Sequence, residues 1–536
     1  MATLAQPDEP LGELPAAGRF RPAMEAPTGS ADGWVTLVEL VPWAGPLDHG
    51  DAQRHLAMAR ALTADPRVTA LTVTDNAGGH IRMSPLTLGR SLREMGADVL
   101  VHVSCRERSR GALTSMAWDL ASSGLTNLLA LSGDYPVDGY QGLARPVFDI
   151  DSVGLLSLLR DLPATQPALF AGGVVNPFKS VERDLLPQLL KLAMKVRAGA
   201  RFVITQVGWD ARSWDELLRW MRLEGLPVPT LAAVYILNRG VARAFHGGRV
   251  PGCALPAELL GIVEKAVDSP DKGRTQFLEL AARQVVVARG LGFRGIYLAG
   301  QRNADEVARV LDIADAYAPG DWRALAGAVS FPRAGAFRLF EPAKDPHLAS
   351  DVPARGLVAS RTPPARRRAR RNLPLAYKID RLVHERVFTP GTPGFRAAAA
   401  ASDRVEQLRL RRPLHVLEQA AKVPLFACHD CGDCSLPEIA YLCPESQCVK
   451  NQRNGPCGGS NEGRCEVPGK ACIWALAYDR LKPYGEELTM LERPPTLGDN
   501  ALRGSSAWAN TFLGRDHAHH PTAAGAAIDE RRGTRH

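Results

Sequence analysis

The feature of this sequence that most constrains its fold is a series of eight short, strongly apolar runs between residues 35 and 301. Each run ends near a polar residue and is followed by a stretch with helical periodicity, and most begin about 30 residues apart, the usual length of a βα unit. Runs rich in Val, Ile and Leu are typical of strands buried on both faces, which indicates parallel strands. The runs are VTLVELVP (from Val35), VTALTVTD (Val68), DVLVHVSC (Asp98), NLLALSGD (Asn127), ALFAGGVV (Ala168), RFVITQVG (Arg201), TLAAVYIL (Thr230) and GIYLAGQR (Gly295).

Eight such units in series predict an α/β fold, a closed (β/α)8 TIM barrel, with an open doubly wound sheet as the alternative. The first run leads into VPWAGPLDHG, which lacks the GxGxxG fingerprint of dinucleotide-binding sheets and so disfavours that alternative. The gap before the eighth run is longer and has room for two extra helices. Residues 304–319 are predicted to form the eighth helix.

Composition divides the rest of the chain. Periodicity fades after the barrel, Pro and Arg dominate the next stretch, and the cysteines follow. We therefore expect five segments: a disordered lead-in (1–32), the barrel (33–330), a Pro/Arg-rich linker (331–372), a small cysteine-rich domain (373–490) and a disordered tail (491–536).

The charge pattern bears on partners and location. Much of the net charge of +8 comes from the proline-flanked run RTPPARRRARR at 361–371, which is typical of a solvated linker. The alternative is a nucleic-acid-binding segment. Such segments usually combine basic residues with aromatic side chains on which bases stack, and no aromatic residue lies among these arginines, so nucleic-acid binding is not expected. No run of about eighteen uncharged apolar residues occurs, so no membrane span is expected. The N-terminus lacks a signal peptide, and a cytoplasmic protein is predicted.

Cysteine usage is lopsided, since eight of the ten cysteines lie between residues 428 and 472. Clustered thiols without an export signal favour metal or iron–sulfur ligation over disulfides. CxxCxxC followed by Cys-Pro is similar to a ferredoxin run, although eight residues, not three, precede the fourth cysteine. Eight thiols are enough for two sites with four ligands each, which we call the first and the second thiol set. The first comprises Cys428, Cys431, Cys434 and Cys443, and the second Cys448, Cys457, Cys465 and Cys472. Ligands that interleave between the two sites, or structural zinc in place of iron–sulfur clusters, are the alternatives.

Polar residues at the strand ends are the candidate active-site residues, because the site of such a barrel lies at the C-terminal ends of its strands. Glu39 has apolar neighbours, which should raise its pKa and suit a general acid; a strand-end Glu paired with an Arg is the alternative. Asp134 could instead be a turn residue, and His102 a core histidine. The strand-end residues are Glu39, Thr74, His102, Ser104, Asp134, Asn176 and Gln206.

Six stretches around these residues and at the last strand resemble methylenetetrahydrofolate reductase and occur in the order of that family. They are VELVP, VTDNAGG, VHVSC, LALSGDYP, KVRAGARFVITQ and YLAGQRN. The resemblance implies a flavin-bearing barrel that reduces 5,10-methylenetetrahydrofolate to 5-methyltetrahydrofolate, a step of one-carbon metabolism and methionine biosynthesis. The flavin N5 would deliver hydride after a positioned acid promotes opening of the imidazolidine ring. It implies Glu39 as general acid, Asp134 beside the flavin and affecting folate, Gln206 on the pterin, and Thr74, His102 and Lys195 on the flavin.

Departures from the family pattern leave two points open. Gln188, Lys191 and Met194 stand where the family usually has more specific polar contacts, so the flavin is FAD or FMN. QVGWD, from Gln206, replaces an aromatic stretch near which nicotinamide stacks. The expected electron donor is therefore either NAD(P)H or a ferredoxin-like protein.

The cysteine region, from FACHDCGDC to CIWALAYDRLK, resembles the C-terminal or small-subunit partner of acetogen-type methylenetetrahydrofolate reductases, described as an iron–sulfur protein. The resemblance implies one or two [4Fe–4S] clusters that relay electrons to the flavin. The alternatives are a structural zinc domain that docks a partner and a zinc-ribbon nucleic-acid-binding protein. A homo-oligomer is compatible with the sequence, which does not specify one. Cys105 and Cys253 are expected to be buried thiols.

Overall fold

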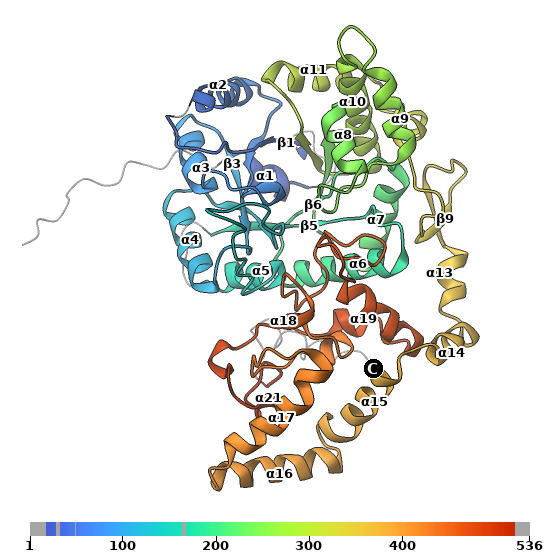
Figure 1. The fold of residues 1–536 in the computed structure, drawn as a ribbon. Helices are drawn as coiled ribbons and strands as arrows, with labels where there is room; N and C mark the ends of the chain where they lie inside the picture. The colour runs from blue at the N-terminus through green and yellow to red at the C-terminus, as the bar shows by residue number, and fades with distance from the viewer. Residues whose placement is uncertain (1–17, 28–32, 49, 163–167, 520–536) are drawn as a thin grey trace, which may run out of the picture.

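The computed structural model describes residues 18–27, 33–48, 50–162 and 168–519, and there eight parallel strands close into a barrel (Figure 1). The first strand pairs with both the second and the eighth, which confirms the predicted (β/α)8 barrel. The strands are β1 (Val35–Leu40), β2 (Ala70–Val73), β3 (Val99–Ser104), β4 (Asn127–Leu131), β5 (Phe170–Val175), β6 (Val203–Thr205), β7 (Thr230–Tyr235) and β8 (Gly295–Ala299).

Helices surround the barrel. Three of them lie between β7 and β8, two more than a regular unit needs, as the long gap in the sequence predicted. The helices are α2 (Gly50–Ala64), α3 (Pro85–Glu94), α4 (Arg110–Ser122), α5 (Ser152–Asp161), α6 (Glu182–Arg197), α7 (Ala211–Leu223), α8 (Arg239–His246), α9 (Ala257–Ala266), α10 (Arg274–Leu291), α11 (Ala304–Asp315) and α12 (Trp322–Ala326).

Part of the expected disordered lead-in is ordered. Helix α1 (Phe20–Glu25) buries Phe20, whose ring lies 6.0 Å from that of Phe170 and 5.1 Å from that of Phe202. These two partners stand at the start of β5 and just before β6, so α1 packs at the N-terminal end of the barrel. The sequence predicted disorder here because Phe20 is ordered by residues far away in the chain, which local composition does not reveal. Residues 1–17 and 28–32 lie outside the described residues.

The expected linker is also folded. It forms an antiparallel pair, β9 (Phe340–Pro342) and β10 (Ala349–Pro353), and helix α13 (Arg355–Ser360). Side chains of α7 hold it, since Asp215 Oδ2 accepts from the Ala349 amide at 2.9 Å and Glu216 Oε2 from the Leu339 amide at 3.1 Å. These carboxylates satisfy backbone N–H groups of the segment that would otherwise need partners from a further strand.

The basic run forms helix α14 (Pro363–Arg371) and contacts the C-terminal region. The Arg366 guanidinium pairs with Glu487 at 3.4 Å, and Arg370 Nε donates to the Pro483 carbonyl at 2.8 Å. The contacts of Arg366 and Arg370 give these arginines a structural role within the chain.

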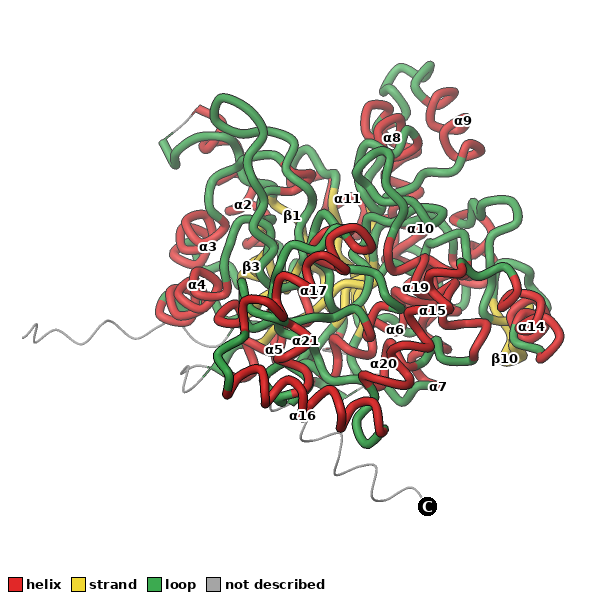
Figure 2. The backbone as a smooth tube through the Cα atoms, turned by 60° about the horizontal axis from the view of Figure 1, so that its bottom comes forward, coloured by secondary structure: helices red, strands yellow, loops and turns green. Residues whose placement is uncertain are grey.

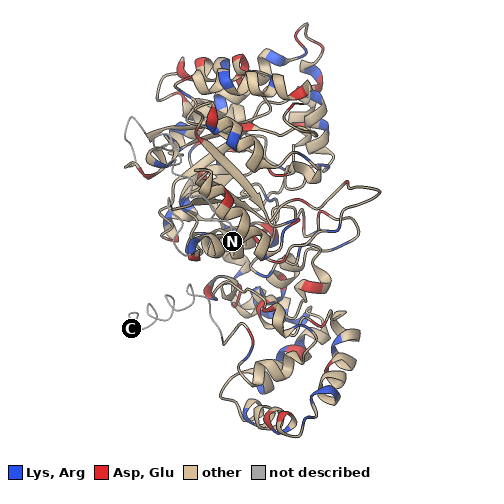
Figure 3. Cartoon of the chain, turned by 90° about the vertical axis from the view of Figure 1, so that its left-hand side faces the viewer, with Lys and Arg blue, Asp and Glu red and all other residues tan. Residues whose placement is uncertain are grey.

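Figure 3 shows Lys and Arg mingled with Asp and Glu over the barrel helices in that view.

The cysteine-rich module lies against the barrel beside α5 and α6 and consists of helices joined by long loops (Figures 1 and 2). Part of the expected disordered tail belongs to it: Asn510 is buried, and its Nδ2 donates to the Gly432 carbonyl at 2.8 Å. Residues 520–536 lie outside the described residues. The helices are α15 (Leu375–Val383), a π-helical turn (His384–Phe388), α16 (Pro393–Gln407), α17 (Arg411–Phe426), α18 (Pro444–Gln447), α19 (Ile473–Leu481), α20 (Thr489–Glu492) and α21 (Ala507–Phe512).

Module and barrel share a hydrophobic core separate from the main barrel core. Leu186 and Leu190 of α6 belong to the same buried cluster as Trp474 and Tyr478 of α19. Nearly all of α6 is buried as a result, since it packs on β5 on one side and on the module on the other. No described helix is long and apolar enough to cross a membrane.

Candidate functional site

Glu39 lies near the C-terminal end of β1 and is half-buried. The Tyr297 hydroxyl of β8 donates to Glu39 Oε2 at 2.5 Å, and Gln301 Nε2 donates to the Glu39 backbone carbonyl at 2.5 Å. Burial raises the pKa of Glu39, and the Tyr297 hydrogen bond offsets only part of that rise. Glu39 therefore keeps its proton to a higher pH than an exposed Glu, as a general acid requires.

Neighbouring strand ends carry buried polar atoms that have no hydrogen-bond partner among the described residues. They are Thr74 Oγ1, His102 Nε2 and Ser104 Oγ. The His102 ring lies 6.0 Å from the Tyr297 ring, so these atoms belong to the same side of the barrel as Glu39. Burial lowers the pKa of His102 to about 4, and its imidazole is neutral at physiological pH. Buried polar atoms without partners are expected to bind a ligand or water.

Asp134 lies in the loop after β4, where its Oδ2 accepts from the Gly78 amide at 2.9 Å. The two loops touch closely, because a Cβ on Gly79 would stand 2.3 Å from the Tyr135 carbonyl oxygen. Gly79 also has a φ of +85°, so glycine is needed there on both counts. Asp134 is thereby fixed against the loop that follows Thr74.

Gln206 and Asn176 meet on another side of the mouth. Asn176 Nδ2 donates to the Gly252 carbonyl at 2.8 Å, and a Cβ on Gly252 would stand 3.2 Å from Gln206 Nε2. Gln206 Oε1 accepts from the Val207 amide at 2.8 Å. The ends of β5 and β6 and the loop after α8 thus meet at Gly252.

Lys195 is placed differently from the other candidates. It lies on α6 next to β5, and its Nζ donates to the Val174 carbonyl at 2.6 Å. Burial lowers the pKa of Lys195 to about 7. Its aliphatic chain packs over Gly173, so the side chain occupies the layer between helix and barrel wall.

Sequence reasoning did not single out Tyr297 or the buried pair of Asp75 and Arg108. Asp75 Oδ2 accepts from the Ser104 amide at 2.9 Å and from Arg108 Nη1 at 2.5 Å. The signal for Tyr297 is its position in the eighth apolar run, where a polar hydroxyl must find a partner once buried. Nothing local in the sequence marks Asp75 as the partner of Arg108.

The first thiol set, Cys428, Cys431, Cys434 and Cys443, borders one cavity. The Asp430 amide donates to Cys428 Sγ at 3.4 Å, and buried Lys422, whose Nζ pairs with Glu418 at 2.6 Å, lines the same cavity. Burial raises the pKa of the Cys428 and Cys434 thiols, and the Lys422 cation opposes that rise in favour of thiolates, the form that binds metal.

The second thiol set, Cys448, Cys457, Cys465 and Cys472, borders another cavity. Burial raises the pKa of Cys448 to about 11 and that of Cys472 to about 12, while nearby backbone N–H groups oppose the rise in both. Four of the eight clustered thiols thus border each of two cavities, and their grouping into two ligand sets stays a prediction. All ten cysteines are free, Cys105 and Cys253 are buried, and no group of three or more Cys, His, Asp or Glu in the described ranges could hold a single metal ion.

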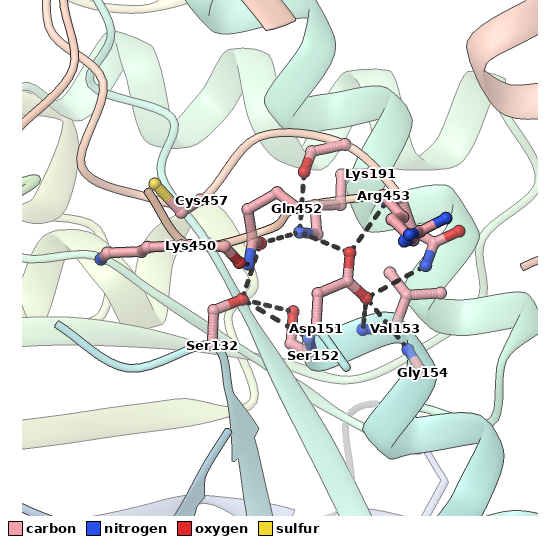
Figure 4. Close-up of polar contacts among 12 residues, drawn as sticks. Ser132, Asp151, Ser152, Val153, Gly154, Lys191, Lys450, Gln452, Arg453 and Cys457 are labelled. Carbon is pink, nitrogen blue, oxygen red and sulfur yellow. Dashed lines mark hydrogen bonds and ion pairs between the residues drawn. The ribbon is translucent and has the colours of Figure 1, made fainter. Parts of the chain in front are cut away.

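A buried polar network joins the module to α5 and α6 (Figure 4). Asp151 Oδ1 accepts from the Val153 and Gly154 amides at 3.0 and 3.1 Å, and Asp151 Oδ2 lies 3.6 Å from Lys191 Nζ. Lys191 Nζ donates to Gln452 Oε1 at 2.8 Å, and so does the Ser132 hydroxyl at 2.9 Å. Gln452 is fully buried. This network accounts for Lys191, which departs from the pattern of the resembled family.

Comparison with known proteins identifies two regions. A family model described as "Methylenetetrahydrofolate reductase" matches residues 49–312, and one described as "Methylene-tetrahydrofolate reductase C terminal" matches residues 409–497. The first covers most of the barrel, and the second contains all eight clustered cysteines.

Among curated relatives, the chain is 29% identical over 157 residues to "5,10-methylenetetrahydrofolate reductase" of Pectobacterium carotovorum subsp. carotovorum, and 31% identical over 157 residues to the protein of that name from Salmonella typhimurium. Each match covers 29% of this chain and 49% of the relative, so the chain spans about half the length of the curated relatives it matches. A solved structure titled an uncharacterized protein from Clostridium thermocellum that binds 5-methyl-5,6,7,8-tetrahydrofolic acid covers 52% of this chain and 93% of its own, at 12% identity and a TM-score of 0.39. A likeness of that size carries no argument.

Proposed function

The chain belongs to the methylenetetrahydrofolate reductase family, and on that premise we propose that it reduces 5,10-methylenetetrahydrofolate to 5-methyltetrahydrofolate at the barrel mouth. The observation that carries the proposal is the half-buried Glu39, whose carboxyl group is held by Tyr297 next to unpartnered polar atoms at the ends of β2 and β3. We also propose a cytoplasmic setting, which suits ten free cysteines.

Glu39 acts as the general acid in this proposal. Because Tyr297 holds Oε2, Oε1 is the oxygen that carries the proton to the ring nitrogen of the substrate. Protonation opens the imidazolidine ring to an iminium, which can then accept hydride. A positioned acid typically contributes about 10²- to 10⁴-fold to the rate. Gln206 would bind the pterin, from the side of the mouth where it meets Gly252.

The polar atoms at the strand ends fit a flavin. Thr74 Oγ1 and His102 Nε2 are buried and unpartnered among the described residues, and each can hydrogen-bond to a heteroaromatic edge. When bound, the flavin would supply the hydride. Asp134, held by the Gly78 amide, would place a carboxylate beside it. The resemblance also gives Lys195 a flavin contact, for which its Nζ would have to leave the Val174 carbonyl. FAD and FMN are both open, since the polar positions of α6 bind the module.

The two thiol sets fit iron–sulfur clusters. In each set four cysteines border a cavity, whereas one zinc ion needs four sulfurs at about 2.3 Å from a common point. Backbone N–H groups point at several of the sulfurs, as in sites that stabilise bound thiolates. When bound, such clusters would supply single electrons from a donor, either a ferredoxin-like protein or NAD(P)H.

Cofactor analysis of anaerobically purified protein tests the assignment. We expect flavin, about eight irons per chain and a broad visible absorption in addition to that of flavin. A colourless protein with two zinc ions and no iron would support a structural zinc domain and remove the electron relay. Formation of 5-methyltetrahydrofolate with a reduced artificial donor tests the barrel separately, and its absence from flavin-loaded protein would contradict the reductase proposal.

A further inference from the structure

The second thiol set lies against the barrel mouth. Gln188 Nε2 on α6 donates to the Cys457 carbonyl at 2.6 Å, and Lys179 Nζ donates to the Gly458 carbonyl at 2.7 Å. The same Gly458 oxygen stands 2.8 Å from where a Cβ on Gly252 would lie, and Gln206 Nε2 stands 3.2 Å from that point. Gly458, which directly follows Cys457 in the chain, therefore lies close to Gln206, the residue expected to bind the pterin.

The residues beside Cys448 and Cys465 hold the backbone on both sides of Asp134. Lys450 Nζ donates to the Gly133 carbonyl at 2.7 Å, and Glu466 Oε1 accepts from the Tyr135 amide at 3.0 Å. Lys450 and Glu466 also pair with each other at 2.6 Å, with side chains only 3% and 4% exposed. At such burial these charges are fixed in place by each other and by the two peptides.

The first thiol set is enclosed by the module itself. The Asp430 carbonyl accepts from the Gly504 amide at 3.0 Å, and α17 supplies Lys422 to the cavity wall. His429, which also lines that cavity, is exposed. This set therefore lies nearer the module surface, and its walls do not include the barrel mouth.

The two cavities are neighbours. Arg453 lines the first and Gln452 the second, so a single peptide bond links their walls. Helix α18 connects them as well, running from Cys443 at its N-cap to Cys448 at its C-cap, a rise of only about 7 Å along a helix. Two centres in neighbouring cavities, one beside the mouth and one toward the surface, form an ordered series.

We propose that the second thiol set is the centre that acts on the barrel, and that Lys450 and Glu466 are positioning residues that hold Asp134 in register with it. The inference rests on the proposed function for what fills the thiol sites and names which of them serves the barrel. A filled second site orders residues 448–466 and, through this clamp, the Gly133–Tyr135 backbone. The first set is then the outer centre.

Hydrogen exchange of the full, iron-loaded chain tests the clamp, with the peptide that contains Tyr135 as readout. Lys450→Met should speed its exchange about tenfold or more, because a buried charged hydrogen bond is lost. Lys482→Met is the matched control, since it cuts a module–barrel contact, Lys482 Nζ to Glu182 Oε2 at 2.5 Å, that involves neither residues 448–466 nor the Gly133–Tyr135 loop. Unchanged exchange in Lys450→Met, or an equal change in Lys482→Met, overturns the proposal.

A pair of cysteine variants tests the order of the two sites. Cys457→Ser and Cys431→Ser should each lose about four irons, but only Cys457→Ser should speed exchange at Tyr135 and weaken flavin binding severalfold. Equal effects, or a larger effect in Cys431→Ser, overturn the proposed order. A wild-type chain with flavin but no iron contradicts the relay alone, and Lys450→Met still reports on the clamp. If Cys457→Ser does not fold, the exchange result for Lys450→Met decides.

Discussion

The barrel mouth and the network around Asp151, beneath the module, treat buried polar groups in opposite ways. At the mouth, Thr74, His102 and Ser104 have buried polar atoms without partners in the described structure, and burial raises the pKa of Glu39. In the network, Asp151 accepts several hydrogen bonds and lies opposite a lysine. The difference separates a surface prepared for a ligand from a polar network completed by the protein. It predicts that mutations at the mouth change activity and those in the network change stability.

Glu39→Gln should have the largest effect and should sharpen the contrast. Glutamine keeps the shape and can still accept from Tyr297, but it has no proton to give. Turnover of 5,10-methylenetetrahydrofolate should fall about 10²- to 10⁴-fold, while flavin content and the free energy of unfolding stay at or above wild type. Near-normal turnover would mean that Glu39 is not the acid, and a large loss of stability would break the comparison.

Asp151→Asn should have the converse effect. It leaves Lys191 as a buried charge without its carboxylate, and removing one partner of a buried ion pair costs about 3–5 kcal/mol. Denaturant unfolding measures that loss. Lys191→Met combined with Asp151→Asn should cost less than the sum of the two single variants, because the uncompensated charge disappears. Additive losses would show that the pair is not coupled.

Opposite pH dependences should follow from the two carboxyl groups. The folded-state pKa of Glu39 is raised by burial, so its contribution to stability is present below its usual value of 4.5 and is lost as the pH rises through the folded pKa. For Asp151, burial raises the pKa, but Lys191 and the hydrogen bonds outweigh it and the net pKa is lowered. Its contribution is present above the usual value of 3.8 and is lost as the pH falls.

Unfolding free energies of wild type, Glu39→Gln and Asp151→Asn across acidic and neutral pH check these signs. Glu39→Gln should gain on wild type as the pH rises, and Asp151→Asn should fall further behind it. Two difference curves of the same sign would contradict the assignment of the two groups.

Thr74→Val should have the smallest effect. The variant keeps the shape and removes a buried hydroxyl that has no partner in the described structure, so the free energy of unfolding should stay at or above that of wild type. Flavin affinity should drop up to about tenfold, as expected for one hydrogen bond. Fluorescence titration with FMN and FAD measures it, and Ser157→Ala, which removes another unpartnered hydroxyl away from the strand ends, is the control. An unchanged affinity would remove Thr74 from the flavin site.

The barrel could be predicted from the sequence because its information is local. Each strand is a run of buried residues, and a polar residue such as Glu39 at the end of a run marks the mouth. The short cysteine spacings also predict two thiol sets; each set borders its own cavity, and the ligand grouping itself stays a prediction. Chain order and side-chain chemistry were sufficient for the barrel.

The remaining features depend on contacts between distant residues. Phe20 is ordered by Phe170 and Phe202, and the segment after residue 490 is ordered where the Thr496 amide donates to Asn454 at 2.6 Å. Composition alone made both segments look disordered. The clamp on Asp134 is invisible in the sequence for the same reason, since Lys450 and Glu466 meet it from more than 300 positions away.

A single turnover of the reduced protein tests the central claim most directly. The flavin-loaded chain is reduced anaerobically, freed of excess reductant and mixed with 5,10-methylenetetrahydrofolate while flavin absorbance is followed. The account predicts that the flavin is reoxidised with one 5-methyltetrahydrofolate formed for every two electrons that the protein gives up, and that Glu39→Gln stays reduced on the same time scale. Reduced wild-type flavin that persists with bound folate, or a chain that binds no flavin, would contradict it.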